Sequence, residues 1–277
     1  MTQTLEPTAA SRTSPGPFDG VVFDIDGVLT VSGHALPGAR ETLHRIQDSG
    51  LAFAFLTNMT RPRSAVLARL STLGIEFDPA SVLSAPDATL AYLQLHHPGE
   101  CILLLATDTL REDFDGVAVT DEPGRAEVVV VGGPHEDSAN EHLSYSRMND
   151  AFRALQNGAP LVAMQRGLSW QTDEGLALDA GGFIAALEAA TGARATVCGK
   201  PSRHFFDAAV ARIGAPPSRI LMVGDDVEND IRGAASAGLV PALVRTGKFK
   251  PAHMDSVRGI PFHLIDSVVD VPGILGI

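Results

Sequence analysis

The chain has 277 residues, of which 45% are hydrophobic, and it carries a formal net charge of −12 at pH 7. A chain of this size can bury a real core and is long enough for one large domain or two modest ones. An acidic surface disfavours nonspecific binding to nucleic acid and to anionic membranes, so we expect neither as a partner.

The cysteine content and the first residues favour a cytoplasmic protein. The two cysteines, Cys101 and Cys198, do not form a CxxC motif, so we expect neither a disulfide framework nor a structural zinc site. Residues 1–17 are polar, rich in Thr, Ser and Pro, and lack the apolar segment of a signal peptide, which predicts a disordered tail. No apolar run reaches the length that a bilayer requires.

Strand-like and helix-like segments alternate along the chain. Apolar runs predict strands at 21–25, 51–56, 101–106, 127–131, 160–164, 195–198, 219–223 and 240–244. Helical patterns lie between them, at 38–49, 61–73, 86–96, 139–156, 181–191, 202–213 and 229–237. This order predicts an α/β protein with a doubly wound parallel sheet that is covered by helices on both faces. Ligands of such sheets bind beyond the carboxyl ends of the strands.

The spacing of the polar segments predicts an inserted domain. Candidate catalytic side chains follow the first two strands, and the next such segment begins only at Gly199. The long interval between them contains its own predicted strands and helices. We therefore predict a core domain formed by 18–84 and 181–277, with a second α/β domain, 85–180, inserted as a cap.

Two carboxylates close the first predicted strand. Asp24 and Asp26 lie two residues apart, directly before Gly27. Alternate side chains of a strand point to the same side, so both acids can project from its carboxyl end, and the glycine lets the chain turn away. A bound cation would relieve their repulsion, and oxygen ligands of this kind suit Mg²⁺ beside a phosphate. A simple Asp-Gly turn after a strand is the alternative.

Two further strand ends carry groups that suit a phosphate. Thr57 and Asn58 follow the second strand, where the hydroxyl and the Asn58 backbone N–H can donate to phosphate oxygens, although both residue types also favour helix N-caps and turns. Lys200, between Gly199 and Pro201, can neutralise a nucleophile and a phosphate, although a lone lysine is more often solvated.

The predicted strand at 219–223 ends in an acidic loop that contains Asp225, Asp226 and Asp230. Asp225 is placed to bind a cation directly, and the other two are candidates for a supporting role, with Asp230 holding metal-bound water or orienting Lys200. An acidic first helical turn that interacts with the helix dipole is the alternative. We favour metal binding, because this loop holds more acidic residues than a helix N-cap requires. A doubly wound sheet also brings the carboxyl ends of its strands together in one cleft.

These segments resemble, in the same order, the motifs of the haloacid dehalogenase (HAD) superfamily of aspartate-nucleophile phosphotransferases. The four motifs are DIDGVLT, the strand that ends in Thr57, GKP with Lys200, and GDDVEND. A cap between the second and third motifs is similar to the type IIA capped, NagD-like branch. The runs RTGKF and GDDVENDIRGAASAG resemble the subgroup of phospholysine phosphohistidine inorganic pyrophosphate phosphatases.

The resemblance implies a Rossmann-like HAD core and a Mg²⁺-dependent phosphatase that hydrolyses a small phosphorylated metabolite. It implies that Asp24 attacks phosphorus and forms an aspartyl-phosphate, and that Asp26 acts first as general acid and then as general base. It also implies a set of ligands: Mg²⁺ is held by Asp24, the Asp26 carbonyl and Asp225, and the phosphate oxygens by Thr57, the Asn58 backbone and Lys200.

In this family a cap loop reaches over the cleft and decides the substrate. The candidate loop here is 165–173, where Arg166 can meet an anionic leaving group and Trp170, the single Trp, can stack on a ring or exclude water. A surface loop whose Trp packs on the core is the alternative. The segment 132–135, which ends in His135, is a second candidate lining of the cleft, although a histidine in a polar loop is more often simply exposed. An exposed cap sheet can pair two chains as a homodimer.

Two other functions fit parts of the pattern. A phosphotransferase or mutase has the same core but passes the phosphoryl group to a second hydroxyl instead of water. A receiver module of a signalling protein also combines acids, a Thr and a Lys on a similar sheet. Receivers are much shorter, lack a cap and place the accepting Asp on a middle strand, so a phospho-accepting switch fits less well.

Overall fold

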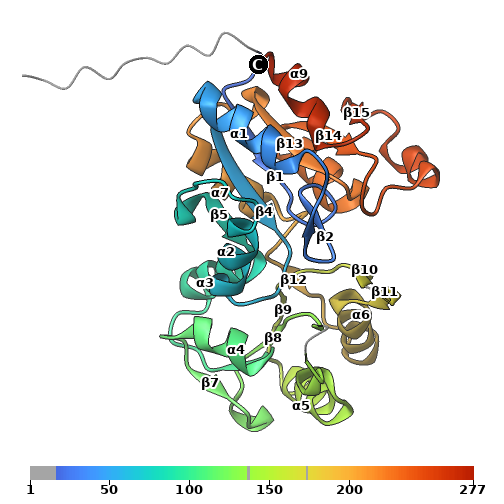
Figure 1. The fold of residues 1–277 in the computed structure, drawn as a ribbon. Coiled ribbons are helices and arrows are strands. Elements are labelled where there is room, and N and C mark those ends of the chain that lie inside the picture. The colour runs from blue at the N-terminus through green and yellow to red at the C-terminus, as the bar shows by residue number, and fades with distance from the viewer. Residues whose placement is uncertain (1–16, 136–137, 173) are drawn as a thin grey trace, which may run out of the picture.

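The computed structural model describes residues 17–135, 138–172 and 174–277. Figure 1 shows two bodies, each built around its own sheet, with the C-terminus at the outer end of the first body. The predicted tail lies outside the described residues, apart from its last residue. Within the described ranges, no helix is long and apolar enough to cross a membrane.

The first body, the core, contains a six-stranded parallel sheet. Its strands, in spatial order, are β15 (His263–Ile265), β14 (Val240–Val244), β13 (Ile220–Gly224), β1 (Gly20–Phe23), β4 (Ala52–Thr57) and β5 (Val82–Ser84). Every neighbouring pair is parallel. Because β13 and β4 flank β1, the carboxyl ends of the three strands that carry predicted site residues lie side by side.

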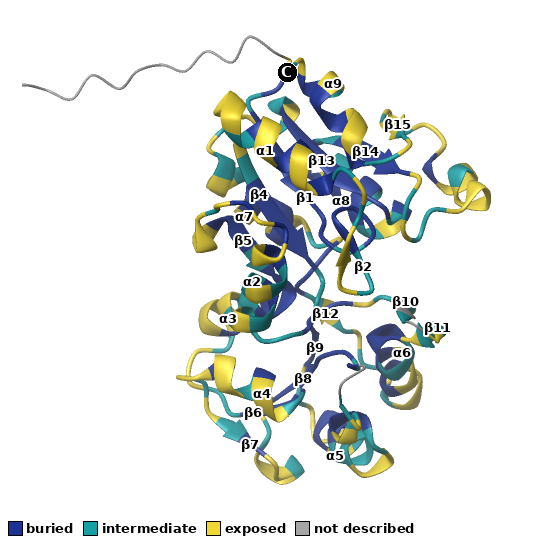
Figure 2. Ribbon diagram, in the orientation of Figure 1, coloured by how far each residue is buried: buried dark blue, intermediate teal, exposed yellow. Residues whose placement is uncertain are grey.

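Helices cover both faces of the core sheet. Val21 and Phe23 pack on one side, in a cluster shared with α1 (Ala39–Ser49), α2 (Arg63–Ser71) and α9 (Val271–Leu275). Val22 faces the other side, with α7 (Arg203–Ile213) and α8 (Gly233–Ala237). The strands are thus buried between two helical layers, as the dark blue of Figure 2 shows. The predicted doubly wound α/β core is confirmed.

The second body, the cap, has a parallel sheet and helices of its own. Its strands, in spatial order, are β12 (Thr196–Val197), β9 (Leu161–Ala163), β8 (Val128–Val131), β6 (Ile102–Leu105) and β7 (Val119–Thr120). One face packs on α5 (Tyr145–Gln156) and α6 (Ala180–Thr191). The other face packs on α3 (Ala85–His96) and α4 (Asp108–Arg111). The predicted α/β cap is therefore present.

The cap extends further along the chain than the predicted end at residue 180. Ala180, Ile184 and Leu187 turn the apolar face of α6 onto the cap strands. β12, which follows α6, pairs with β9 of the cap sheet. The chain therefore leaves the cap sheet after Val197, and the assignment of 181–197 to the core was wrong. The amphipathic pattern of α6 identified a buried face but not the sheet that buries it.

Several short elements lie outside the predicted set. The helix predicted over 139–156 begins only at Tyr145, because the Ser144 hydroxyl accepts a hydrogen bond from the Arg147 N–H and so caps it there. Two antiparallel hairpins are β2 (Thr30–Val31) with β3 (His34–Ala35), and β10 (Ser169–Thr172) with β11 (Gly175–Leu178). A single π-helical turn, Val227–Arg232, precedes α8.

Candidate active site

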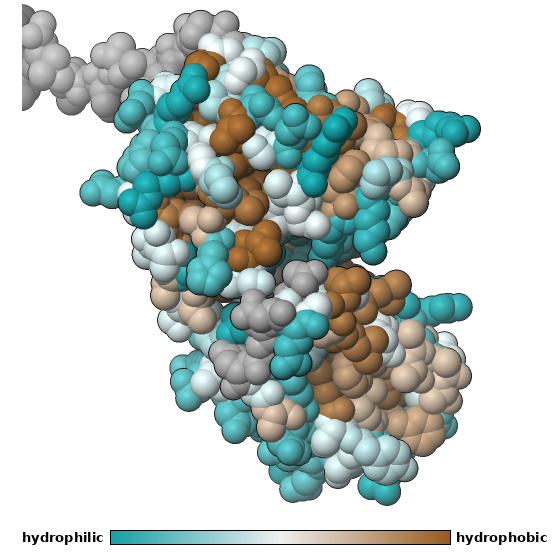
Figure 3. Space-filling model, turned by 45° about the vertical axis from the view of Figure 1, so that its right-hand side comes forward, coloured by the Kyte–Doolittle hydropathy of each residue, from teal (hydrophilic) through white to brown (hydrophobic). Residues whose placement is uncertain are grey.

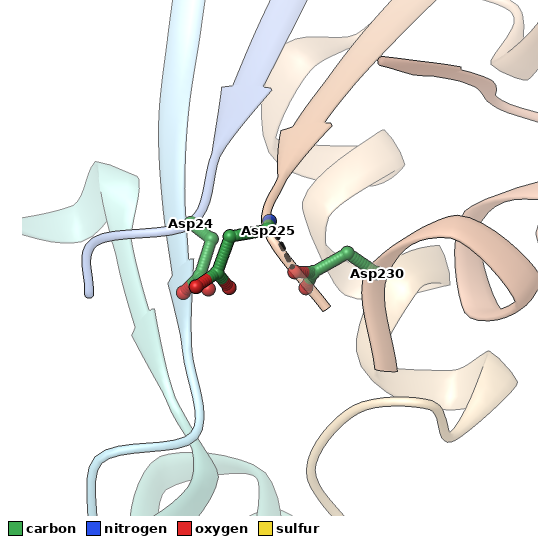
Figure 4. Close-up of side chains that lie close together, drawn as sticks. All are labelled: Asp24, Asp225 and Asp230. Carbon is green, nitrogen blue, oxygen red and sulfur yellow. Dashed lines mark hydrogen bonds between the residues drawn. The ribbon is translucent and has the colours of Figure 1, made fainter. Parts of the chain in front are cut away.

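Three acidic side chains converge at the carboxyl edge of the core sheet. Asp24 follows β1, Asp225 follows β13, and Asp230 lies in the π-helical turn behind them. One carboxylate oxygen from each lies within 4.8 Å of the others, and all three residues are buried. Figure 4 shows the Asp24 and Asp225 side chains extending in the same direction from adjacent strand ends, with their carboxylates close together.

Backbone hydrogen bonds hold this acid cluster, defined as Asp24, Asp225 and Asp230. The N–H groups of Asp225 and Asp226 both donate to Asp230 Oδ2, each at 3.0 Å. Asp225 Oδ2 in turn accepts the N–H of Lys248 at 2.7 Å. The Asp230 carboxylate therefore shapes the loop that presents Asp225 to the cleft.

Lys200 lies inside the acid cluster. Its ammonium nitrogen is 2.8 Å from Asp24 Oδ1 and 2.7 Å from Asp230 Oδ1, and its side chain is only 2% exposed. Burial opposes a charge there, but Asp230 and Asp24 outweigh it and raise the pKa of Lys200. Lys200 is thus a buried, permanent cation that touches the predicted nucleophile.

One lysine does not neutralise three buried carboxylates. Burial raises the pKa of Asp24, and Lys200 offsets part of that effect. Burial raises the pKa of Asp225 well above its usual range, and the charges of Asp24 and Asp230 add to it. Burial likewise raises the pKa of Asp230 to about 7, against the effect of Lys200. Lys248 also lowers the pKa of Asp225 in part, but two lysines do not balance three carboxylates, and a compact divalent cation would supply the missing positive charge.

The space around Asp225 is shaped by two glycines. A Cβ at Gly27 or at Gly247 would lie 1.9 Å from Asp225 Oδ2. Both glycines also have positive φ angles, of 85° and 62°, in the left-handed region that favours glycine. The carboxylate oxygens and the cradle formed by these glycines fit a hard divalent cation such as Mg²⁺. The acidic cluster is the feature of the described residues that suits a metal.

Thr57 and Asn58 lie beside the cluster at the end of β4. The Thr57 hydroxyl accepts the N–H of Met59 at 3.1 Å, which is the turn geometry weighed as the alternative. The Asn58 side chain is bound to the backbone of Lys200: it accepts the Lys200 N–H at 2.8 Å and donates to the Lys200 carbonyl at 3.0 Å. The sequence had suggested only a backbone role for Asn58.

Asp26 and Asp226 are held by other groups. Asp26 Oδ1 lies 2.5 Å from Arg69 Nη2 and accepts a longer bond from the Thr30 hydroxyl at 3.4 Å. Asp226 accepts the N–H groups of Glu228 and Asn229, each at 3.0 Å, so it caps the π-helical turn. The cap function weighed as the alternative therefore applies to Asp226.

In the predicted substrate loop, the Arg166 guanidinium pairs with both oxygens of Glu188 in α6, one of them at 3.0 Å. Trp170 lies in the β10–β11 hairpin, opposite Ala177. Its indole N–H is buried and has no hydrogen-bond partner among the described residues. Arg166 is thus engaged within the cap, and contact of either side chain with a substrate stays a prediction.

The two bodies meet beside this site, and Figure 3 shows a hollow between them on one face. The Gly133 N–H of the cap donates to the Thr60 hydroxyl of the core at 3.2 Å. His135, in the same cap segment, lines a cavity of about 590 Å³ together with Arg61 and Asp108. The acid cluster is not part of that cavity's lining, so contact of His135 with the predicted cleft stays a prediction.

Three residues near the cluster were missed from the sequence: Arg69, Asp179 and Lys248. Nothing in the sequence around Arg69, apart from its place in a predicted helix, indicates that it lies near the site. Asp179 caps α6, where Asp is common. Lys248 lies in the run RTGKF, which served only to support the resemblance to a subgroup. A positive charge directly after a core strand is the feature that could have identified it as a site residue.

The chain is similar in sequence to known proteins over most of its length. Residues 21–120 match the haloacid dehalogenase-like hydrolase family, and residues 197–271 match a second HAD hydrolase-like family. The chain is 36% identical over 248 residues to haloacid dehalogenase-like hydrolase domain-containing protein 2 of Bos taurus, covering 89% of this chain and 92% of the relative. It is 37% identical over 240 residues to phospholysine phosphohistidine inorganic pyrophosphate phosphatase of Danio rerio, covering 84% and 85%.

Solved structures agree with these relatives. The fold matches 4-nitrophenylphosphatase of Thermotoga maritima with a TM-score of 0.82 and 25% identity, over 93% of this chain and 97% of the other. It matches NagD of E. coli K-12 with a TM-score of 0.76 and 26% identity, over 91% and 98%. The chain therefore belongs to the haloacid dehalogenase-like hydrolase family, and it is a phosphatase of the NagD-like branch.

Proposed function

We propose that this phosphatase is Mg²⁺-dependent, that it hydrolyses a small phosphorylated metabolite and that it works through an aspartyl-phosphate on Asp24. The observation that carries this proposal is the 2.8 Å contact of Lys200 with Asp24 Oδ1, beside the carboxylate of Asp225. A nucleophilic carboxylate must be held ionised near an incoming anion, and a buried cation in contact with it does so.

The reaction has two steps in this proposal. An oxygen of Asp24 attacks phosphorus, the bond from phosphorus to the leaving oxygen breaks, and Asp26 gives that oxygen a proton. Water then attacks the phosphorus of the aspartyl-phosphate, the bond from phosphorus to the Asp24 oxygen breaks, Asp26 accepts a proton from the water, and inorganic phosphate leaves as the Asp24 carboxylate is restored. The Asp26 carboxylate, which contacts Arg69, turns toward the leaving oxygen for this role.

Mg²⁺ would be held by carboxylate oxygens of Asp24 and Asp225 and by the carbonyl of Asp26, with Asp230 behind them. When bound, it would supply positive charge that offsets the negative charge of the nucleophile and the phosphate. The phosphate oxygens would be held by the Thr57 hydroxyl, the Asn58 backbone N–H and Lys200. A cytoplasmic location and a homodimer through the cap stay predictions.

The test is phosphate release from p-nitrophenyl phosphate in the presence of Mg²⁺. Asp24→Asn should lower turnover by several orders of magnitude while thermal unfolding stays near the wild-type value. Asp115→Asn, at an exposed acid of the cap, is the matched control and should keep wild-type rates. A folded Asp24→Asn enzyme with near wild-type turnover would refute the nucleophile.

Denaturing mass spectrometry during turnover tests the intermediate. A phosphoryl group attached to the peptide that contains Asp24 is expected, and attachment elsewhere would contradict the proposal. Inclusion of an alcohol acceptor separates hydrolysis from transfer, because a transferase would move the phosphoryl group to the acceptor in preference to water.

A further inference from the structure

Lys248 lies in the loop that follows β14, next to the acid cluster. Its backbone N–H donates to Asp225 Oδ2 at 2.7 Å. Two residues earlier, the Thr246 hydroxyl donates to the carbonyl of Gly27. These bonds tie the loop to the segments that carry Asp24 and Asp225, so the Lys248 side chain starts from a fixed point at the edge of the site.

The Lys248 ammonium faces the core and the cap at once. Its nitrogen lies 3.5 Å from Asp226 Oδ2. Its charge also acts on Asp225 and Asp24 of the core and on Asp179, which caps α6. Burial opposes the charged form, but these four carboxylates outweigh it and raise the pKa of Lys248. Lys248 is therefore a cation between the two bodies.

The other cations near the site are committed to acids. Lys200 is 2% exposed and held between two carboxylates at 2.7 and 2.8 Å. Arg69 and Arg166 each hold one carboxylate. Lys248 differs in the length of its contact, since its ammonium lies 3.5 Å from the nearest carboxylate oxygen, and unlike Lys200 its side chain is 40% exposed. Within the described part of the chain, its ammonium makes one hydrogen bond, the 3.5 Å contact with Asp226.

Asp226 does not depend on that contact. Its Oδ1 accepts two backbone N–H groups, and its Oδ2 accepts the Asn229 side-chain amide at 2.9 Å. Asp226 therefore stays satisfied if Lys248 turns away from it. Because an ammonium has three donors, Lys248 can also bind a ligand while it keeps this contact. Because its charge also acts on Asp179 of the cap, we infer that Lys248 lies where the leaving part of a substrate would extend from the phosphorus toward the cap.

We propose that Lys248 binds a second anionic group of the substrate, on the part that leaves. The preferred substrates are then phosphorylated compounds that carry a carboxylate or another anionic group close to the phosphoryl group. This inference rests on the proposed function, because the transferred phosphoryl group is assigned there to Lys200, Thr57 and Asn58. A hydrogen bond between charged groups in such a site contributes about 1.5–3 kcal/mol, or roughly 10- to 100-fold in affinity.

The test compares two phosphonates of nearly equal shape. Phosphonoacetate carries a carboxylate beside its phosphonate, whereas acetonylphosphonate has a methyl ketone there. Their dissociation constants are measured by calorimetry with the full chain and Mg²⁺, so the result does not depend on turnover. The wild-type protein should bind phosphonoacetate about tenfold or more tightly than acetonylphosphonate.

Lys248→Met should abolish that preference, and Lys248→Arg should keep it. Lys250→Met removes an exposed lysine of the same loop, is the matched control and should bind both phosphonates as the wild type does. Thermal unfolding checks each variant, and Lys248→Gln repeats the measurement if the Met variant unfolds. Mn²⁺ binding without phosphonate should be unchanged or tighter in Lys248→Met, because a neighbouring positive charge is lost.

Two results would overturn the inference. One is an unchanged preference for phosphonoacetate in Lys248→Met. The other is an equal loss for both phosphonates together with weaker Mn²⁺ binding, which would mean that the residue only supports Asp225. Failure of the proposed function has a different signature, since it appears as full turnover by the Asp24→Asn variant.

Discussion

Asn58 and Lys200, which are 142 positions apart in the sequence, form a closed pair of hydrogen bonds. The Asn58 side-chain oxygen accepts the Lys200 backbone N–H at 2.8 Å, and the Asn58 side-chain nitrogen donates to the Lys200 carbonyl at 3.0 Å. A Cβ at Gly199 would lie 2.5 Å from Asn58 Oδ1 and 2.6 Å from the Met164 carbonyl. The glycine before Lys200 therefore makes room for this pairing, which sets where the buried ammonium begins.

The first prediction concerns this pair. Asn58→Ala keeps the backbone N–H but releases the Lys200 backbone, so kcat/KM should fall by about 10- to 100-fold. Lys200→Met should cost more, because it removes the cation. If Asn58 acts through Lys200, the double variant should be no slower than Lys200→Met alone. Losses that multiply would show that the Asn58 side chain acts independently of the lysine.

The second prediction concerns the cradle of Asp225. A Cβ at Gly247 would lie 1.9 Å from Asp225 Oδ2 and 2.6 Å from the Gly27 Cα, so Asp225 must move in Gly247→Ala. We expect affinity for Mn²⁺ or Mg²⁺ to fall by about tenfold or more, measured by calorimetry without substrate. Gly259→Ala is the control, because its φ is also positive, at 89°, while its Cβ would meet nothing within 4 Å. Equal metal affinity in both variants would contradict the cradle.

The third prediction concerns the Arg166–Glu188 pair in the cap. Arg166→Met leaves the Glu188 carboxylate, whose side chain is 7% exposed, without its ionic partner and, among the described residues, with only the Ala195 N–H as a hydrogen-bond donor, at 2.9 Å. We expect a loss of about 2 kcal/mol in the free energy of unfolding. This is below the 3–5 kcal/mol of fully buried pairs, because the Arg166 side chain is 39% exposed and water can reach the site. Chemical denaturation measures it.

Arg153→Met is the control for that exchange, since Arg153 is 63% exposed and lies 3.8 Å from its acid, and it should cost less than about 0.5 kcal/mol. A large change in substrate preference with unchanged stability in Arg166→Met would instead support the substrate contact expected from the sequence.

The fourth prediction concerns pH and His142, a buried residue of the cap. Its Nε2 lies 3.0 Å from the Gly133 carbonyl, which can only accept, so Nε2 carries the hydrogen. Burial lowers the pKa of His142, outweighing that hydrogen bond. Below the ordinary value of about 6.5, the unfolded chain therefore binds more protons than the folded one, and this group costs stability as pH falls.

His142→Gln keeps a donor amide but does not titrate. As the pH falls from 7.5 to 5.5, the unfolding temperature of the wild type should therefore decrease more than that of His142→Gln. His44→Gln, at an exposed position of α1, is the reference exchange. A difference that stays constant across this pH range in His142→Gln would show that His142 is not a source of acid sensitivity.

Most of the fold follows from patterns that act locally. Short apolar runs such as Val21–Phe23 and Ile220–Val223 are typical of strands buried on both faces, and the helical segments between them then cover those faces. Once the strands are parallel, Asp24, Thr57 and Asp225 must meet at one edge. The site edge could therefore be predicted before any coordinates.

The partner of each group could not be predicted in the same way. The apolar stripe of α6 suits either sheet, and only packing assigns it to the cap. The charge of an arginine does not indicate which acid it will contact. Only the tertiary structure shows that Arg166 pairs with Glu188 and that Arg69 pairs with Asp26.

The sequence by itself determined the α/β architecture and the sheet edge at which the candidate site residues gather, because strand and helix periods and motif spacing are properties of residues close together in the chain. The tertiary structure alone decided the Asn58 clamp on Lys200, the extent of the cap and the position of Lys248 between the two bodies. Those depend on distances between segments far apart in the chain, and such distances exist only once both cores have packed.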